Sequence, residues 1–200
     1  MSITTLTRQA AGRPPVTSHA AIEAAAFALF ESNGFDQTTT DDIAERVGVG
    51  RRTLFRYFPS KFDIPWGQFD ASLASLRDSL ESMPATMPLW QSVQQAVVTF
   101  NRFDTGATEQ HRIRMRLILQ TPSLQAHSVL MYRRWREVIA NYVAQRTLLR
   151  PDALLPRTVG HVSLALAISA YEQWLIESDM QLEVLLSQSL AVLRSYFDHE

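Results

Sequence analysis

Residues 39–61, TTDDIAERVGVGRRTLFRYFPSK, decide the fold of this chain. Thr39 is a good helix N-cap, and Asp42 three positions later completes an aspartate variant of the capping box. The helix that follows has an apolar face made of Ile43, Ala44 and Val47. Gly48 ends this helix, because glycine readily adopts the left-handed conformation found after a last helical turn.

A second short helix is predicted at 51–58, directly after the link at 48–50. Leu54 and Phe58 lie four positions apart and therefore face the core together, and Pro59 prevents a simple continuation of the helix. Two short helices joined by a glycine-containing turn are typical of a helix-turn-helix, whose second helix lies in the major groove of DNA. We therefore predict a DNA-binding helix-turn-helix at 39–58.

The outer surface of this second helix carries the side chains that we expect to contact DNA. Residues 46–61 include five basic residues and no acidic one, although the whole chain has a formal net charge of -1. We expect Arg52 and Thr53 to read bases. Phosphate contacts are expected from Arg51, Arg56, Tyr57 and Lys61. An ordinary solvated basic face is the alternative, and the spacing, the capping and the glycine turn favour DNA.

Thr39 and Thr40, at the start of the first of these two helices, can offer hydroxyl and backbone N–H groups to a further phosphate. Simple N-capping is the competing role for these two residues. Further upstream, Arg8 and Arg13 belong to a polar N-terminal segment. That segment is either an arm that enters the adjacent minor groove or a plain flexible tail.

Helical periodicity continues on both sides of the motif and no strand pattern accompanies it, so we predict an all-α protein. A first helix is expected to end at Asn33, and a long fourth helix should run from Ser60 to about Glu81 and connect two domains. Further helices are predicted at about 89–104, 109–120, 124–147, 152–178 and 181–198. The predicted domains are a flexible N-terminal arm at 1–17, a helix-turn-helix DNA-binding domain at 18–66 and a helical ligand-binding and dimerisation domain at 67–200.

Composition limits the other functions that this chain can have. It contains 200 residues, 46% of them hydrophobic, and no cysteine, so thiolate catalysis and thiolate metal sites are excluded. The five histidines are scattered, and no phosphate-binding loop or catalytic motif occurs. No stretch approaches the ~20 apolar residues that span a bilayer. We expect a cytoplasmic protein without a cofactor that is not an enzyme; a small helical enzyme and a DNA-binding structural protein without an effector remain the alternatives.

The region at 111–150 holds eight arginines and one acidic residue, more positive charge than solubility requires. These arginines are suited to an anionic headgroup, beside aromatic and methionine side chains that can line an apolar cavity. The candidate ligand-binding residues are Phe103, Arg112, Met115, Arg116, Met131, Arg134, Trp135 and Trp174. Alternatively, the aromatic residues fill the core and the arginines pair with the acidic segment at 151–200.

The last two predicted helices are rich in leucine, valine and alanine. They have enough apolar surface to form a four-helix seam between two copies of the chain, so we expect a homodimer through the last two helices. Burial of the same side chains within one subunit is the competing interpretation.

Several segments resemble one known family. Gly34–Phe35, Thr38–Ala44, Val47–Val49 and Thr53–Lys61 are similar to the DNA-binding motif of TetR-type transcriptional regulators, over roughly 18–66. Gly50 occupies a position where many members have a serine cap. The resemblance implies a homodimer on an operator of near two-fold symmetry, phosphate contacts at Thr39, Tyr57 and Lys61, and a C-terminal domain for a small-molecule effector.

A narrower resemblance rests on Gly12–Pro15, Gly50–Thr53 and Asp63–Gly67. These segments are similar to the regulators encoded beside mycofactocin biosynthesis genes. That group implies a repressor that responds to a long-chain acyl-CoA. In such a protein the effector would favour a dimer whose recognition helices no longer match successive major grooves ~34 Å apart.

Overall fold

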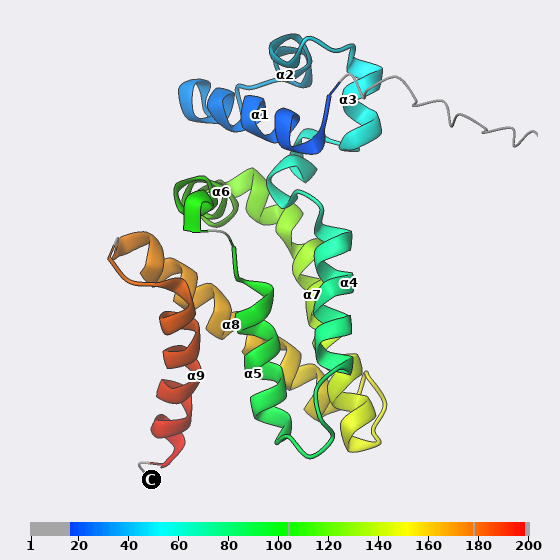
Figure 1. Cartoon of the computed structure of the whole chain (residues 1–200), viewed down its shortest axis with the longest axis vertical. Helices are drawn as coiled ribbons and strands as arrows, with labels where there is room; N and C mark the ends of the chain where they lie inside the picture. The colour runs from blue at the N-terminus through cyan, green and yellow to red at the C-terminus, as the bar shows by residue number, and fades with distance from the viewer. Residues whose placement is uncertain (1–16, 104, 178, 199–200) are drawn as a thin grey trace, which may run out of the picture.

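The computed structural model describes residues 17–103, 105–177 and 179–198, and all of its regular structure in these ranges is helical (Figure 1). At one end lie α1 (His19–Asn33), α2 (Thr40–Val47) and α3 (Arg51–Tyr57). The all-α fold is confirmed, and so is a helix-turn-helix at 39–58. The predicted arm at 1–17 lies outside the described residues except for Thr17.

Local capping sets the ends of these first helices. The Ser18 hydroxyl accepts a hydrogen bond from the Ala21 amide at 3.2 Å at the start of α1. The reciprocal capping box at Thr39 and Asp42 is present, with bonds of 3.1 and 2.8 Å. The Thr39 amide and, to a smaller extent, the Thr39 side chain bond to the Asp42 carboxylate and lower its pKa. Gly50 is the N-cap residue of α3. Because glycine has no side chain, it makes no side-chain capping bond.

The prediction of one uninterrupted helix over 60–81 is wrong. A 3₁₀ helix, η1 (Lys61–Trp66), contains Pro65 and ends at Gly67, and α4 (Phe69–Glu81) begins only afterwards. Proline has no N–H for a continuing helix, and Gly67 has a φ of 57°, which breaks the helical path. The chain therefore passes from the helix-turn-helix to the larger group through a 3₁₀ helix, a glycine turn and α4, and not through one continuous helix.

The remaining helices form a second, larger group. They are α5 (Leu89–Phe100), a short 3₁₀ helix η2 (Thr105–Ala107), α6 (Thr108–Gln120), α7 (Pro122–Thr147), α8 (Leu154–Ile176) and α9 (Leu182–Asp198). The last four α-helices lie within two residues of their predicted bounds. Helix α5 ends at Phe100 instead of the predicted 104. The next residue, Asn101, donates from its side chain to the Val97 carbonyl at 2.7 Å and so occupies one of the last carbonyls of the helix.

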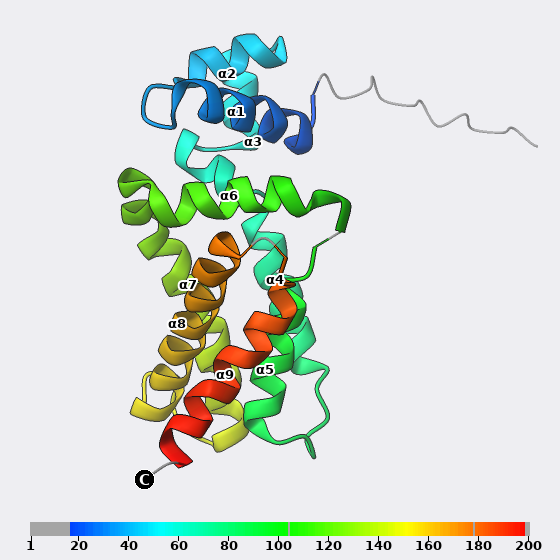
Figure 2. The same cartoon turned by 90° about the vertical axis from the view of Figure 1, so that its left-hand side faces the viewer.

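Helix α6 crosses the molecule between α1–α3 and the other helices of the larger group (Figure 2). Two hydrophobic cores lie on either side of it. The larger core joins α4, α5, α7, α8 and α9, and the smaller one joins α1, α2, α3 and η1. Leu124, in the first turn of α7, is fully buried in the smaller core, and Ile113 and Leu117 of α6 pack against it. The corner between α6 and α7 thus completes the core of the DNA-binding end.

Candidate DNA-binding face and effector cavity

Helix α3 presents basic side chains on its outer surface. Arg51, Arg52 and Arg56 are exposed, whereas Leu54 and Phe58 are buried at 1% and 2% exposure as predicted. The predicted DNA contacts Thr53 and Tyr57 are half-buried on the same helix. The structure therefore brings the predicted base-reading and phosphate-binding residues of α3 onto one short helix, with their charged ends in solvent.

Sequence reasoning missed Phe55. Its ring is 38% exposed, and the guanidinium carbon of Arg51 lies 5.5 Å from the ring centroid. Arg51 also pairs with Asp41 of α2 at 3.4 Å. An aromatic side chain exposed on a recognition helix can contact a thymine methyl group. The signal was present in the sequence, because a helix that turns Leu54 and Phe58 inward leaves position 55 outward.

Lys61 is held by the backbone of the loop between α1 and α2. Its Nζ donates to the carbonyls of Phe35 and Thr38, both at 2.8 Å, and of Asp36 at 3.3 Å. The ammonium also lies 4.5 Å from the Phe35 ring centroid. Burial lowers the pKa of Lys61, and the charge of Asp36 opposes this. The three N–H donors of an ammonium match these three carbonyls, so the phosphate contact predicted for Lys61 stays a prediction while the structure gives it an internal role.

Tyr57 and Thr39 also have internal partners. The Tyr57 hydroxyl donates to the Thr17 carbonyl at 2.8 Å, and its ring meets that of His19 edge-on at 4.9 Å. The Thr39 oxygen accepts the Asp42 amide in the capping box, and the Thr39 side chain also bonds to the Asp42 carboxylate, so the phosphate contact of Thr39 stays a prediction. Thr40 is the first residue of α2 and is half-buried.

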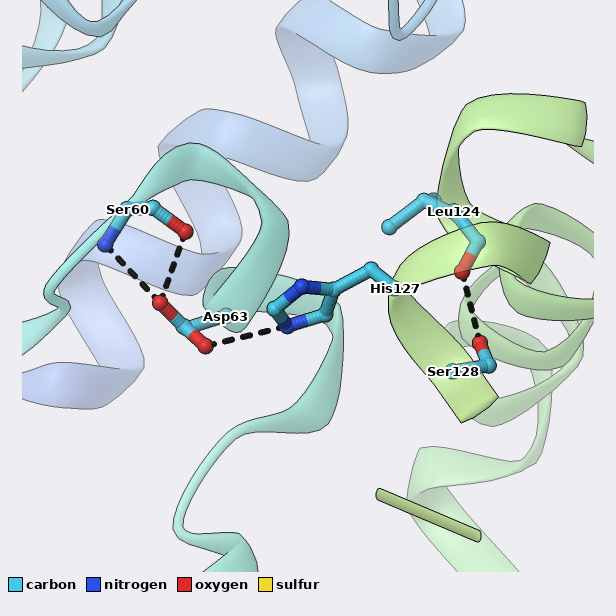
Figure 3. Close-up of polar contacts among 5 residues, drawn as sticks. All are labelled: Ser60, Asp63, Leu124, His127 and Ser128. Atoms are coloured by element: carbon cyan, nitrogen blue, oxygen red, sulfur yellow. Dashed lines mark hydrogen bonds and ion pairs between the residues drawn. The ribbon is translucent and has the colours of Figure 1, made fainter. Parts of the chain in front are cut away.

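A polar contact joins η1 to α7 (Figure 3). One oxygen of the Asp63 carboxylate accepts from the Ser60 amide and hydroxyl, at 2.9 and 2.7 Å, and the other lies 3.1 Å from His127 Nε2. The His127 ring also packs on Phe62, with centroids 5.7 Å apart. The end of the helix-turn-helix segment is therefore fixed to the first turns of α7.

Arg114 of α6 makes a second connection to the DNA-binding end. Its guanidinium forms an ion pair with Glu23 of α1 and donates to the Pro65 carbonyl of η1 at 2.7 Å. The guanidinium carbon lies 5.0 Å from the centroid of the Phe27 ring. The side chains of Arg114 and Glu23 are only 20% and 12% exposed. Sequence reasoning counted Arg114 in the basic excess of 111–150 but did not select it as a site residue.

A cavity of about 430 Å³ lies beside Arg114, and this volume falls within the usual range for a small-molecule site. Its wall includes Glu23 and residues from 65–69, which belong to the DNA-binding end and the turn into α4. The wall also includes a largely apolar set from α5 to α8: Phe100, Phe103, Met115, Ile118, Tyr132, Trp135, Leu164, Ala167 and Ile168. The cavity therefore lies between α5 to α8 on one side and α1, η1 and the turn into α4 on the other.

Three polar residues of this wall bind one another. The Tyr171 hydroxyl donates to Asn101 Oδ1 at 2.8 Å, so His111 Nε2, 3.0 Å from the same hydroxyl, is the donor in the second bond. Burial, and to a smaller extent the charge of Arg114, lowers the pKa of His111 to about 4, and burial raises the pKa of Tyr171. The His111 ring stacks on Phe103 at 4.2 Å. This part of the wall is therefore polar and uncharged at neutral pH.

Of the eight predicted ligand-binding residues, Phe103, Met115 and Trp135 line this cavity. The other five do not lie on its wall: Arg112, Arg116, Met131, Arg134 and Trp174. Helical periodicity identifies inward-facing residues but cannot distinguish a cavity wall from a packed core. The eight predicted residues therefore include both kinds.

The reasons differ among those five residues. Arg112 is 7% exposed, donates to the Trp174 carbonyl and stacks on the Trp174 ring at 4.0 Å, so both belong to the joint between α6 and α8. Arg134 pairs with Asp70 at the surface. Arg116 is exposed on α6 and Met131 is half-buried on α7.

The outer faces of α8 and α9 expose large apolar side chains. Half of the twelve exposed large hydrophobic residues in the described chain lie on these two helices: Leu154, Leu155, Val162, Ile176, Val184 and Val192. The inner faces are buried in the larger core of the same protomer, including Leu185 and Leu186. The inner faces are therefore buried within one protomer, while the outer faces leave apolar side chains in solvent.

Within the described residues no helix is long and apolar enough to cross a membrane. The same part of the chain holds no cluster of three or more histidine or acidic side chains that suits a metal ion. The combination of a helix-turn-helix with a helical domain that encloses a cavity is that of a ligand-responsive transcriptional regulator.

The chain belongs to the TetR family of bacterial regulatory proteins, whose N-terminal model matches residues 22–64. Its second half, residues 87–198, matches the family described as the MftR C-terminal domain. Regulators of the TetR family bind operator DNA and small-molecule effectors, are dimers and are not enzymes.

Named relatives agree with this assignment. The chain is 42% identical, over 94% of both chains, to a Mycobacterium tuberculosis protein assigned as the mycofactocin biosynthesis transcriptional regulator MftR. It is 29% identical to the HTH-type transcriptional regulator TcmR of Streptomyces glaucescens, over 80% of this chain and 74% of TcmR.

Solved structures share the fold at low sequence identity. The TetR-family repressor FadR of Thermus thermophilus, in complex with lauroyl-CoA, is 22% identical with a TM-score of 0.54, over 88% of this chain and 93% of FadR. The fatty acid degradation regulator FadR of Bacillus halodurans is 14% identical with a TM-score of 0.64, over 88% of this chain and 97% of that one.

Proposed function

We propose that this regulator is a repressor that leaves its operator when a long-chain acyl-CoA binds in the cavity beside Arg114. The observation that carries the proposal is the composition of the cavity wall, which combines apolar side chains of α5 to α8 with Glu23 of α1 and Trp66 of η1. A ligand in this cavity would touch both the sensor and the elements that hold the helix-turn-helix. Binding there would therefore change the equilibrium between DNA-binding and released dimers.

For the DNA side we propose that Arg52 and Thr53 read bases and that Phe55 adds an apolar contact. Arg51, Arg56, Tyr57, Thr39 and Thr40 would contact phosphates. Lys61 would act through the loop at 35–38, because its three donors are already bonded to that loop. An arginine fork suits guanine O6 and N7 as well as phosphate oxygens, so its chemistry alone does not separate base contacts from phosphate contacts. We assign the two roles from the position of each arginine on α3.

For the effector, the apolar wall suits an acyl chain, and the volume of about 430 Å³ suits the chain alone and not the whole of an acyl-CoA. The coenzyme part would remain outside. We expect its phosphates to be met by Arg102, which is exposed on the cavity wall, and by Arg134, whose side chain is 44% exposed and lies near the Phe69 ring. The lauroyl-CoA of the Thermus FadR complex supports the same ligand class.

For the dimer we propose pairing of the outer faces of α8 and α9 in two copies of the chain. Four-helix seams of this kind bury apolar side chains that the single protomer leaves in solvent. Val162 and Val192, 36% and 67% exposed, would be covered in this arrangement.

The experiment is a fluorescence anisotropy titration of the protein with its own upstream DNA and with a scrambled duplex, repeated with oleoyl-CoA, oleate and free coenzyme A. We expect selective binding that oleoyl-CoA abolishes. Met115→Trp, which fills the cavity, should keep operator binding and lose the response, while Val129→Trp on the exposed surface of α7 should behave like the unmodified protein. Selective binding that ignores every ligand would remove the effector proposal, and binding without selectivity would favour a structural DNA-binding protein.

A further inference from the structure

The Arg114–Glu23 ion pair is at once part of the cavity wall and part of the contact between α6 and α1. We propose that Arg114 recognises a carbonyl or carboxylate oxygen of the effector in competition with Glu23, so that effector binding separates α1 from α6. This inference rests on the proposed function, because it requires an effector in the cavity. It adds the chemistry that the effector must carry and the contact that it must break.

The geometry places both partners within reach of a ligand. Arg114 and Glu23 both line the cavity, and so does Gly67. A Cβ atom at Gly67 would lie 3.2 Å from Arg114 Nη1 and 3.2 Å from Glu23 Oε1, so the turn before α4 packs directly against the pair. The pair therefore joins α1, the turn after η1 and α6 at one point on the cavity wall.

The guanidinium has donors to offer a ligand. Its hydrogen bonds to Glu23 and to the Pro65 carbonyl use two of its five N–H groups. Trp66, on the same wall, has a solvent-shielded indole N–H with no acceptor in the described chain. Buried donors normally have partners, so an acceptor oxygen on a ligand that reached this N–H would satisfy it.

Competition for Arg114 has a cost that falls on the DNA-binding end. Glu23 is only 12% exposed, and a carboxylate that loses its cation in such a place is strongly disfavoured. The cost is relieved if α1 moves and Glu23 becomes hydrated. Because α1 packs in one core with α2 and α3, such a movement would carry the recognition helix with it.

The other polar groups of the wall do not supply this effect. His111, Tyr171 and Asn101 bond to one another and are uncharged at neutral pH, so an effector oxygen beside them breaks no contact with α1. Arg114, in contrast, is a wall residue whose side chain bonds to both α1 and η1. The predicted recognition chemistry is therefore an acyl group with its oxygen at Arg114 and its chain among the apolar residues.

The experiment measures effector affinity directly, through the quenching of the intrinsic fluorescence of Trp66 and Trp135, which line the cavity. Oleoyl-CoA, oleate and oleyl alcohol are compared in the presence and absence of operator DNA. The first two ligands carry the required oxygen and the alcohol lacks a carbonyl group. The ratio of the two dissociation constants for one ligand gives its coupling to DNA, typically 5- to 150-fold in allosteric proteins.

Glu23→Gln should bind oleoyl-CoA roughly 10-fold more tightly without DNA, because the competing charge is gone, and should show a smaller coupling ratio. Arg114→Gln should lose the preference for oleate over oleyl alcohol, whereas the coenzyme phosphates of oleoyl-CoA would still meet Arg102 and Arg134. Glu137→Gln is the matched control, since it removes the same charge from an exposed ion pair on α7 and should change neither quantity.

The outcomes separate this inference from the proposed function. If no ligand quenches the fluorescence of the unmodified protein or releases DNA, the proposed function fails. If oleoyl-CoA binds and releases DNA but Glu23→Gln behaves like Glu137→Gln, the proposed function stands and the role of the ion pair is overturned. The affinity ratio of oleoyl-CoA to oleate measures the contribution of the coenzyme, and the ratio of oleate to oleyl alcohol measures that of the acyl oxygen. If the first ratio is the larger, the coenzyme dominates recognition and the proposed role of the acyl oxygen is overturned.

Discussion

Asp63 and His127 lie 64 positions apart in the sequence, yet His127 Nε2 is 3.1 Å from Asp63 Oδ1 (Figure 3). The contact joins η1, at the end of the helix-turn-helix segment, to α7, which spans the larger group of helices. Leu124, one turn earlier in α7, is buried in the smaller core. The two ends of the protein are thus held together by polar and apolar contacts at the same corner.

A double-mutant cycle on this contact should show a real pairwise interaction. Asp63→Ala and His127→Ala should each lower the free energy of unfolding, with a coupling term of about 0.5–1.5 kcal/mol, because the two half-buried groups satisfy each other. Urea denaturation of the two single variants and the double variant measures it. Additive effects, within about 0.3 kcal/mol, would show that the contact contributes nothing of its own.

Gly67→Ala should destabilise the protein by about 1–3 kcal/mol, because Gly67 has a φ of 57° and a Cβ there would lie 3.2 Å from Arg114 and Glu23. Gly50→Ala is the matched control. Its φ is −73° and no atom lies within 4 Å of the added Cβ, so its free energy of unfolding should hardly change. Equal effects of the two substitutions would contradict the strain at Gly67.

Lys61→Met should lower stability by about 1–3 kcal/mol, since it leaves carbonyls of the loop at 35–38 without their donor. Operator affinity should fall as a consequence. The dependence of log K on log salt should keep its slope, because the three donors of Lys61 are already bonded within the protein. A slope reduced by about 1 would instead support the direct phosphate contact expected from the sequence.

Arg52→Ala should relax the choice of base at one position of the operator by about 1–3 kcal/mol, because Arg52 is exposed on the recognition helix. Binding to a panel of operator variants measures the change. Arg77→Ala removes an arginine from α4, far from α3, and should leave the preference intact (Figure 1). Uniformly weaker binding of Arg52→Ala to all sequences would assign Arg52 to phosphate.

Stability should fall between pH 6.5 and about 4 because of His111. The pKa of His111 is lowered from 6.5 to about 4 in the folded protein. Between these two values His111 is protonated in the unfolded chain but stays neutral in the folded protein, so acidification favours unfolding. At pH 7.5 the two states are equally neutral and no penalty applies. Between pH 7.5 and 5 the loss from this group should be on the order of 1–2 kcal/mol.

The measurement is urea denaturation at both pH values for the unmodified protein and for His111→Gln. The variant has no titrating group at this position and should lose less stability on acidification. An identical pH dependence in both proteins would show that His111 does not contribute to it.

The sequence by itself determined the helix-turn-helix, because local interactions define it. The bonds of the Thr39 and Asp42 capping box span three positions, and the glycine turn and the inward pair of α3 are equally local. Such contacts form wherever the chain is helical, so they are readable from residue spacing. The same reasoning placed the later helices within a few residues and failed at 60–81, where a 3₁₀ turn and Gly67 interrupt a helical pattern.

Only the tertiary structure decided which arginines face the cavity and which support the core. Arg112 was expected to meet a ligand, but it is buried against Trp174, 62 positions away. Arg114, two positions later, meets Glu23 across 91 positions. Both lie on one helix with the same charge and similar neighbours in sequence, so spacing cannot separate them. The direction in which α6 crosses the other helices assigns one arginine to the core and the other to the cavity wall.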